Sequence, residues 1–330
     1  FWYPGDVKVD FSSNQFVKGF HDMCIRVYGT NGTVDSHYNG SVRIAGEVKG
    51  FYAGLVMEPK EARKYDTFIH YALAATDMAL EMSGLKISAE NATRVGVVIG
   101  SGIGGLPSIC ENHLTYLEKG PRRVSPFFIP GSIVNMPSGL VSIRTGAKGP
   151  NSATCTACST GAHAIGDAYL YIQHGYCDAA ICGGTESVVA PLTIAGFANM
   201  KALSTRNDQP EKASRPWDRD RDGFVLGEGA GILVLEELES AKRRDAAIIC
   251  EVLGFGMSGD AFHITAPSED GEGAFRAMQM AVWDSVTVSM AALTMGMFMT
   301  MLPVRFVLVS TSFGRIVDSA GTSRPRTASE

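Results

Sequence analysis

Residues 94–105 read RVGVVIGSGIGG, a short apolar run that ends in closely spaced glycines. The run Arg94–Ile99 predicts a buried β-strand, because it is short, apolar and rich in β-branched side chains. The glycines after it predict a tight turn from strand to helix. Strand-like and helix-like runs keep alternating from about residue 43 to about residue 280, and this alternation predicts an α/β architecture.

Further elements are read from apolar spacing and from glycines at helix ends. Upstream, the spacing predicts a helix over Glu58–Met82 that stops at Gly84. Downstream, the predicted elements are a helix over Ser159–His174 stopped by Gly175, a strand over Asp178–Cys182 ending at Gly183 and Gly184, a strand over Gly231–Leu235, a helix over Glu236–Arg244 and a strand that starts over Glu251–Phe255.

The composition is that of a folded protein, with 45% of the 330 residues hydrophobic and 19% charged. This length allows one large or two medium domains. The 29 Lys and Arg are spread thinly in a chain of net charge −5, which excludes a basic face for nucleic acid. Seven cysteines at irregular spacing indicate a reducing compartment, the cytoplasm, rather than a secreted disulfide framework.

The two ends of the chain differ from this pattern. The first 42 residues show little periodicity and no signal or transit peptide, and a chain that begins at Phe1 is expected to be a fragment or a processed product. Ser285–Val304 carries no charge and five of the 14 Met, and about 20 such residues are formally long enough to cross a bilayer. Its scarcity of Ile, Leu and Phe, together with Gly296 and Pro303, favours a segment outside the membrane. Asp318–Glu330 is rich in Ser, Thr and Arg, and it predicts disorder.

The glycine-rich turn matches G-x-G-x-x-G at Gly100, Gly102 and Gly105, a pattern typical of dinucleotide-binding loops. A nucleotide site also needs an acidic residue about 20 positions later, for the ribose. The stretch Lys119–Gly166 contains no Asp or Glu, and Pro107 stands where the phosphate-binding helix would begin. The sequence therefore favours a tight turn with close backbone packing over a nucleotide site.

A second candidate, the C-x-x-C at Cys155 and Cys158, allows three interpretations. A zinc half-site needs a second ligand pair, and Cys177 and Cys182 are separated by four residues with no His cluster nearby, so we expect no metal. A redox dithiol would have its reactive cysteine first and the second inside the helix. The third interpretation makes Cys158 a single nucleophile at the strand-to-helix junction and Cys155 a buried strand residue.

Physical chemistry favours the third interpretation. Small residues would let a substrate approach the sulfur closely; they are Ala157, Ser159, Thr160, Gly161 and Ala162. Free N–H groups and the dipole at the start of a helix stabilise a thiolate, and a thiolate attacks acyl groups. Spacing alone leaves open the alternative that Cys158 is one more buried small hydrophobic residue.

A charged run, residues 215–224, imitates the start of a calcium-binding loop through Asp218, Asp220 and Asp222. Gly229 stands at the twelfth position, where such a loop requires Glu. The run therefore predicts a solvated loop with local ion pairs.

Residues 156–166, TACSTGAHAIG, resemble the nucleophile motif of β-ketoacyl-acyl-carrier-protein synthases of the synthase II type. Supporting runs follow in order within residues 43–280: GIGG at 102–105, SPFF at 125–128, ALSTRN at 202–207, RPWD at 215–218 and DGFVLGEGAG at 222–231. The resemblance implies the thiolase-like layered α/β fold, with the N-terminal half largely present and the C-terminal half mostly missing. It divides the chain into a divergent segment 1–42, the synthase N-terminal domain 43–250, the start of the C-terminal half 251–280 and a partly disordered tail 281–330 outside the family pattern.

The resemblance also implies a reaction, the decarboxylative condensation of fatty-acid elongation. Cys158 takes the acyl group from an acyl-carrier protein, malonyl-acyl-carrier protein loses CO₂, and its carbanion attacks the acyl group to give a 3-oxoacyl-carrier protein two carbons longer. Motif matching places Ile109 in the acyl pocket near a homodimer interface, Phe197 as a gate of that pocket and Lys201 against the carrier protein. The backbone N–H of Cys158 is expected to be an oxyanion-hole donor. No cofactor is implied.

The chain also departs from the family pattern. The family's first strand, with a Val/Thr-Gly-x-Gly pattern, should precede Arg43 and is not found there. Both catalytic motifs of the second half, His-Gly-Thr-x-Thr and Gly-His-x-x-Gly-Ala-Ala-Gly, are absent, as are the matching Lys and a late Gly-Phe-Gly-Gly loop. His163 lies five residues after Cys158, roughly 140° around a helix, which makes it a poor partner for the thiol. His263 fits a different family motif, Asp-Ala-x-His, and is not expected to replace the missing base.

We therefore expect an impaired chain that retains at most an acylatable thiol, because the missing His groups would stabilise the developing enolate. A gene sequence truncated or frame-disrupted at both ends would explain these departures. Two alternatives stay open. One is a non-catalytic remnant or a partner subunit of a complete synthase, against which the presence of Cys158 counts. The other is a C-x-x-C redox protein.

Overall fold

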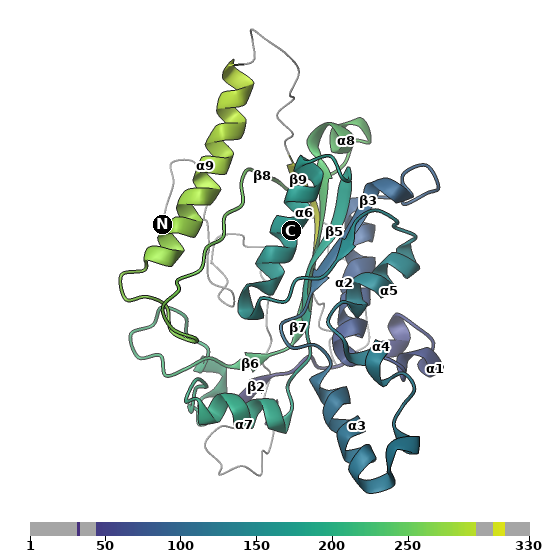
Figure 1. Ribbon diagram of the computed structural model, residues 1–330, viewed down its shortest axis with the longest axis vertical. Helices are drawn as coiled ribbons and strands as arrows, with labels where there is room; N and C mark the ends of the chain where they lie inside the picture. The colour runs from purple at the N-terminus through teal and green to yellow at the C-terminus, as the bar shows by residue number, and fades with distance from the viewer. Residues whose placement is uncertain (1–31, 34–43, 295–305, 314–330) are drawn as a thin grey trace.

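The structure of the protein is a computed structural model that describes residues 32–33, 44–294 and 306–313. Its centre is a six-stranded sheet in the order β4-β3-β5-β7-β9-β8 (Figure 1). The strands are β3 Val95–Gly100, β4 Asn151–Ser152, β5 Ala179–Glu186, β7 Gly229–Glu237, β8 Cys250–Val252 and β9 Phe306–Phe313. Strand β3 is parallel to β4 and β5, β7 is antiparallel to β5, and β9 is antiparallel to both β7 and β8. The predicted α/β architecture is confirmed.

Helices cover both faces of this sheet (Figure 1). Helices α2 (Thr67–Ser83) and α5 (Met136–Thr145) pack on one face, and α6 (Thr160–Gln173) packs on the other. The other helices of the described residues are α1 Pro59–Ala62, α3 Leu106–Lys119, α4 Phe128–Ser132, α7 Pro191–Asn199, α8 Leu238–Arg243 and α9 Glu272–Thr294. Because both faces are covered, the central strand β3 is apolar and buried along its whole length.

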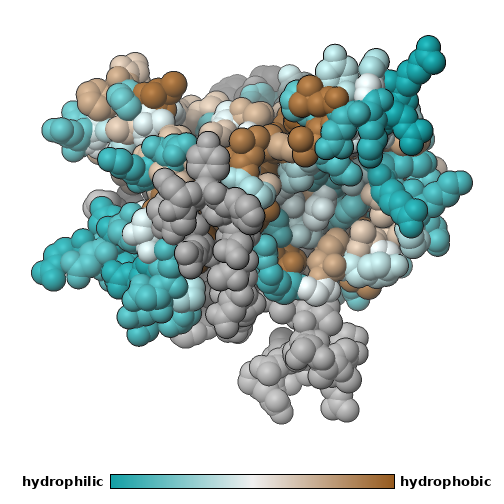
Figure 2. Space-filling view, turned by 90° about the horizontal axis from the view of Figure 1, so that it is seen from below, coloured by the Kyte–Doolittle hydropathy of each residue, from teal (hydrophilic) through white to brown (hydrophobic). Residues whose placement is uncertain are grey.

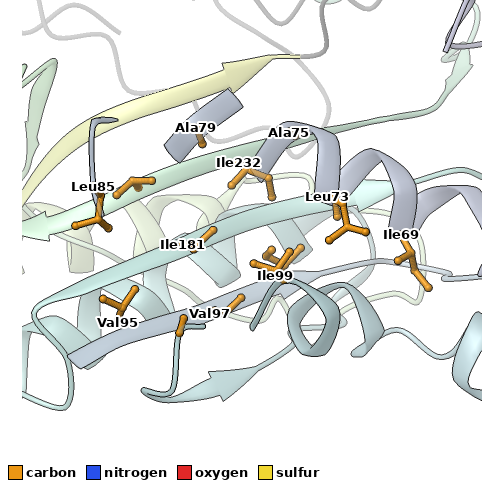
Figure 3. Packing of buried hydrophobic residues seen from close by; sticks show 14 of the residues in the cluster. Ile69, Leu73, Ala75, Ala79, Leu85, Val95, Val97, Ile99, Ile181 and Ile232 are labelled. Carbon is orange, nitrogen blue, oxygen red and sulfur yellow. The ribbon is translucent and has the colours of Figure 1, made fainter. Parts of the chain in front are cut away.

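The side chains of β3 alternate between the two helical layers, since successive residues of a strand face opposite sides. Val97 and Ile99 pack with Ile69 of α2 in one apolar cluster, which Figure 3 shows from close by. Val98 belongs to a second cluster with Tyr169 of α6. Full burial of each such aliphatic side chain stabilises the fold by roughly 1.5–3 kcal/mol, so this strand ties the three layers together.

The single helix predicted over Glu58–Met82 is wrong: the structure has two helices, α1 and α2, with a break between them. At the break, Asp66 has an extended backbone, and its N–H donates to the carbonyl of Gly131 at 3.0 Å. Its carboxylate accepts the N–H of Ser108 at 2.9 Å. These bonds to distant segments replace helical ones, so the apolar pattern continues where the helix does not. The predicted stop at Gly84 is confirmed, with a left-handed φ of 63°.

Two downstream boundaries also differ from the prediction. Strand β5 continues beyond Gly183 to Glu186, because β7 pairs with its full length. Glu236 lies in β7 rather than in a helix, and its buried carboxylate binds Arg244 at 2.6 Å. The helix predicted over Ser159–His174 is confirmed as α6.

Strand β9 comes from the tail 281–330, yet it lies inside the central sheet between β7 and β8. Upstream of α1, the described residues hold two short strands, β1 (Gly32–Thr33) and β2 (Ile44–Gly46). These form a separate sheet with β6 (Leu226–Gly227), in the order β1-β2-β6. In the main sheet, β7 therefore has β5 on one side and β9, a strand from the C-terminal part of the sequence, on the other.

Helix α9 includes the first part of the uncharged run that starts at residue 285. Within the described residues, no helix is long and apolar enough to cross a membrane. The end of that run and the segment Asp318–Glu330, for which disorder is predicted, lie outside the described residues.

His70, which is buried in α2, gives the fold a dependence on pH. Burial lowers the pKa of His70 below its ordinary value of 6.5, although its ring lies 3.1 Å from the carbonyl of Ala62. The unfolded chain therefore takes up this proton at a higher pH than the folded chain does, and stability falls as the pH drops below about 6.5. We expect His70→Gln to lose less stability than the wild type between pH 7.5 and 5.5 in urea unfolding. The exposed His174 is the matched control, and an equal effect of His174→Gln would contradict the assignment.

Candidate active site

The segment 154–160, here called the cysteine turn, connects β4 to α6. Two hydrogen bonds close it onto Thr160: the N–H of Thr156 donates to the Thr160 hydroxyl at 2.8 Å, and the Thr154 hydroxyl donates to the Thr160 carbonyl at 2.9 Å. Between them, Ala157 has a φ of 51°, in the left-handed region that is costly for a residue with a side chain. The turn therefore bends sharply just before Cys158.

Cys158 lies in a 3-10 turn, Ala157–Ser159, directly before the first residue of α6, and its side chain is exposed. This position is the predicted helix N-terminus, and the exposure excludes the alternative of a buried small hydrophobic residue. Cys155 is also exposed, so its prediction as a buried strand residue is wrong. Strand β4 ends at Ser152, before Cys155, and the Cys155 thiol instead contacts the carbonyl of Gly102 at 3.6 Å.

An open cleft of about 710 Å³ borders the cysteine turn. One wall is the turn itself, at residues 156–159, and the other is the loop 260–267. The loop is about 100 residues away in the sequence, and it places His263, Asp260 and Thr265 at the same cleft as Cys158. Sequence reasoning missed this loop as part of the site, although the Asp-Ala-x-His motif at residues 260–263 was the available signal.

The ring of His263 is held in the wall formed by the loop 260–267 by hydrogen bonds from the backbone of that loop. Its Nδ1 accepts the N–H groups of Thr265 and Ala266, both at 3.2 Å. This assignment leaves the ring proton of a neutral imidazole on Nε2, which makes that nitrogen a donor. His163, by contrast, is not among the residues that line the cleft, and its ring packs edge-on against Phe255 with centroids 6.2 Å apart.

The residues predicted from the resemblance to bind substrate or carrier lie away from the cleft lining. Ile109 is on α3, with 40% of its surface exposed. Phe197 is on α7, and its ring packs edge-to-face against Phe224 at 5.2 Å. Lys201 is exposed just after α7, with a left-handed φ of 56°. None of these three side chains lines the cleft beside Cys158, and their roles stay predictions.

The glycine-rich turn after β3 is a closely packed turn, as the sequence favours. A Cβ added at Gly100 would lie 2.3 Å from Thr160 Cγ2, so the cysteine turn presses directly on this backbone. The argument from Pro107 is wrong, because α3 does begin at Leu106. Proline is tolerated in the first turn of a helix, where N–H groups have no helical partner.

The charged run is a solvated loop with a local ion pair, as predicted. Asp218, Asp220 and Asp222 are exposed, and the Arg219 guanidinium contacts the Asp220 carboxylate at 3.3 Å. Asp222 accepts the Ser204 hydroxyl at 2.7 Å and the N–H of Thr205 at 3.0 Å. These bonds hold the loop to the segment 204–205, and they also lower the pKa of the Asp222 carboxyl.

Comparisons with known proteins identify the family and the fold of the chain. The family "Beta-ketoacyl synthase, N-terminal domain" matches residues 28–241. The chain is 59% identical over 247 residues to the 3-oxoacyl-[acyl-carrier-protein] synthase 2 of Vibrio cholerae, covering 75% of this chain and 60% of the relative. A crystal structure of a beta-ketoacyl synthase from Burkholderia phymatum matches with a TM-score of 0.69 and 35% identity, covering 76% of this chain and 61% of that one. The ketosynthase complex AntDE:AntF, described as a type II PKS acyl-carrier protein with its ketosynthase bound to the hexaketide, matches with a TM-score of 0.67 and 28% identity, covering 76% and 60%.

The mixed α/β fold is that of the thiolase-like ketosynthases, which the chain matches in structure. The chain belongs to the β-ketoacyl synthase family. It spans about 60% of the length of the Vibrio cholerae relative.

Proposed function

We propose that this chain carries the acyl-accepting part of a 3-oxoacyl-acyl-carrier-protein synthase of type 2. One observation carries the proposal: the Cys158 thiol is exposed at an open cleft, at the start of a helix and after a sharply bent residue. A thiol in that position is accessible to an acyl group attached to a long tether.

The proposed step is a transthioesterification. The Cys158 thiolate attacks the carbonyl carbon of an acyl thioester on the carrier protein, and a new C–S bond forms. The C–S bond to the carrier then breaks, and the carrier leaves as a thiolate, so charge and protons balance. The backbone N–H of Cys158 is the proposed donor to the oxyanion of the tetrahedral intermediate.

In a complete synthase, malonyl-acyl-carrier protein would then lose CO₂, and its carbanion would attack the acyl group on Cys158. We propose that this second step is impaired here, because the two His motifs that the family uses for it are absent from the sequence. His263 lines the cleft, but its Nδ1 is taken up by two backbone N–H groups, which leaves no free nitrogen acceptor for a proton in the neutral ring.

The proposed partners are acyl-carrier protein and malonyl-acyl-carrier protein. An acyl-carrier protein is the partner in the related ketosynthase complex, and Lys201 is the proposed contact residue. Ile109 and Phe197 are the proposed acyl-binding residues.

Apolar side chains gather in patches on the face shown in Figure 2, and α3 leaves Leu114 and Leu117 more than half exposed, which supports a homodimer that covers them. The six described cysteines are all free, which supports the cytoplasm as the compartment.

Intact-mass analysis tests the proposal. The chain is incubated with an acyl-acyl-carrier protein, and peptide mapping locates any adduct. We expect the mass of one acyl group on Cys158 and no 3-oxo product when malonyl-acyl-carrier protein is added. An adduct on another cysteine, or none, would contradict the proposal.

A further inference from the structure

The glycine-rich turn after β3 binds a carboxylate from the same chain. Glu186, the last residue of β5, accepts the Ser101 hydroxyl at 2.7 Å and the N–H groups of Gly102, Ile103 and Gly104 at 2.8, 3.1 and 3.2 Å. Three successive amides that converge in this way form an anion-binding nest. The loop 101–104 thus has the donor arrangement of a phosphate loop, but the structure places its own carboxylate there.

This loop touches the cysteine turn on its other side. The thiol of Cys155 contacts the Gly102 carbonyl at 3.6 Å. A Cβ added at Gly102 would lie 2.9 Å from Glu186 Oε2 and 3.2 Å from the carbonyl oxygen of Ala157. Gly102 is therefore held between the Glu186 carboxylate and the backbone of the residue that precedes Cys158.

Ala157 needs such support. Its φ of 51° is costly for an alanine, and backbone of this kind persists only where surrounding structure holds it. The hydrogen bonds to Thr160 close the turn from the α6 side, and the loop 101–104 packs against it from the β3 side. Glu186 is the group that fixes the loop, since it accepts four of its donors.

We propose that Glu186 is a positioning residue for Cys158, resting on the proposed role of Cys158 as the acylated thiol. The carboxylate holds the loop 101–104, the loop supports the bend at Ala157, and the bend presents the Cys158 sulfur to the cleft. Glu186 does not itself line the cleft, so it acts through the loop and not on substrate.

Glu186→Gln tests this role with little change in size. One carboxylate oxygen becomes an NH₂ group that faces N–H donors, so part of the nest loses its acceptor. We expect iodoacetamide to modify Cys158 about 10- to 100-fold more slowly, the range that a misplacement of about 1 Å produces in positioned groups. With acyl-acyl-carrier protein, we expect the maximal acylation rate to fall while the half-saturating concentration stays unchanged.

Glu237→Gln is the matched control. Glu237 also accepts two backbone N–H groups, from Glu239 at 2.9 Å and Ser240 at 2.7 Å. It lies at the opposite end of the β5–β7 pair, because Ala179 pairs with Glu236 and Glu186 pairs with Gly229. This variant should leave labelling of Cys158 unchanged.

Two further measurements separate positioning from a general loss of structure. The buried thiols of Cys177 and Cys182 should stay protected in Glu186→Gln, and the midpoint of thermal unfolding should stay near that of the control variant. An unchanged labelling rate at Cys158, or a loss that appears only together with exposure of those two thiols, would overturn the proposal.

If Glu186→Gln does not fold, Ser101→Ala gives the same test in a milder form. It removes one donor to Glu186 and the acceptor for Gly104 N–H at 3.0 Å, and labelling of Cys158 should slow by about 3- to 10-fold, the effect of one ordinary hydrogen bond. No slowing would overturn the proposal. Iodoacetamide labelling needs no carrier protein, so the two proposals can fail separately. If Glu186→Gln slows labelling of Cys158 but acyl-acyl-carrier protein does not acylate the wild-type chain, the proposed function is contradicted and the positioning of Cys158 by Glu186 still stands.

Discussion

Cys158→Ala is expected to lower acylation by acyl-acyl-carrier protein at least about 10³-fold, because it removes the atom that forms the new bond. Cys155→Ala should change the rate by no more than about threefold, the usual range of surface substitutions. The two side chains are both exposed and lie three residues apart, so Cys155 is a close control for access and for local charge. The rates are followed by intact mass against time.

Three other thiols, those of Cys177, Cys182 and Cys250, compete poorly in this experiment. Burial raises the pKa of Cys177 to about 11 and also raises the pKa of Cys182 and of Cys250. These groups therefore stay protonated at neutral pH, where a thiolate is required. Equal losses in Cys155→Ala and Cys158→Ala, with a bond between the two cysteines that dithiothreitol reverses, would instead favour a redox dithiol.

Leu308→Pro is expected to be the most damaging single change in the sheet. The residue lies in β9, opposite Leu235 of β7 and Cys250 of β8, so the strand has neighbours on both sides. Proline lacks the N–H that an interior strand donates, and leaving the partner carbonyl without a donor costs about 1–3 kcal/mol. Urea unfolding should show this loss of stability, and iodoacetamide should gain access to Cys250.

Leu308→Val is the control, since valine keeps the backbone N–H and has a high preference for strands. If Leu308→Pro and Leu308→Val unfold at the same urea concentration, β9 does not contribute to the sheet. The outcome matters for the fold, because β9 lies between β7 and β8 in the main sheet, whereas the two described strands before α1, β1 and β2, belong to the other sheet.

Local patterns in the sequence predicted much of the fold. The run Arg94–Ile99 is almost the whole of β3, because a short run of β-branched residues can only be buried in a covered sheet. The glycine at position 84 ended its helix as predicted, because left-handed backbone favours glycine whatever surrounds it. The break at Asp66 could not be predicted, because its partners, Gly131 and Ser108, lie more than 40 residues away.

In the candidate site, too, local patterns predicted some features, and distant contacts set the others. Cys158 was singled out from its small neighbours and its place before a helix, and the structure places it there. Cys155 was misplaced, because the strand before it is only two residues long and pairing with β3, not composition, sets that length. The loop 260–267 and Glu186 were not recognised as parts of the site, since each reaches the cysteine turn or its supporting loop across about 80 residues or more.

By itself, the sequence determined the alternation of strands and helices, the family and the place of Cys158 before a helix. These depend on residue types and spacings within one element, and such properties act over a few residues. Only the tertiary structure decided which distant groups surround that cysteine: the wall with His263, the Glu186 carboxylate in its nest and β9 beside β7. The physical reason is that hydrogen-bond partners and strand neighbours are chosen when the whole chain packs, and the sequence around each residue does not name them.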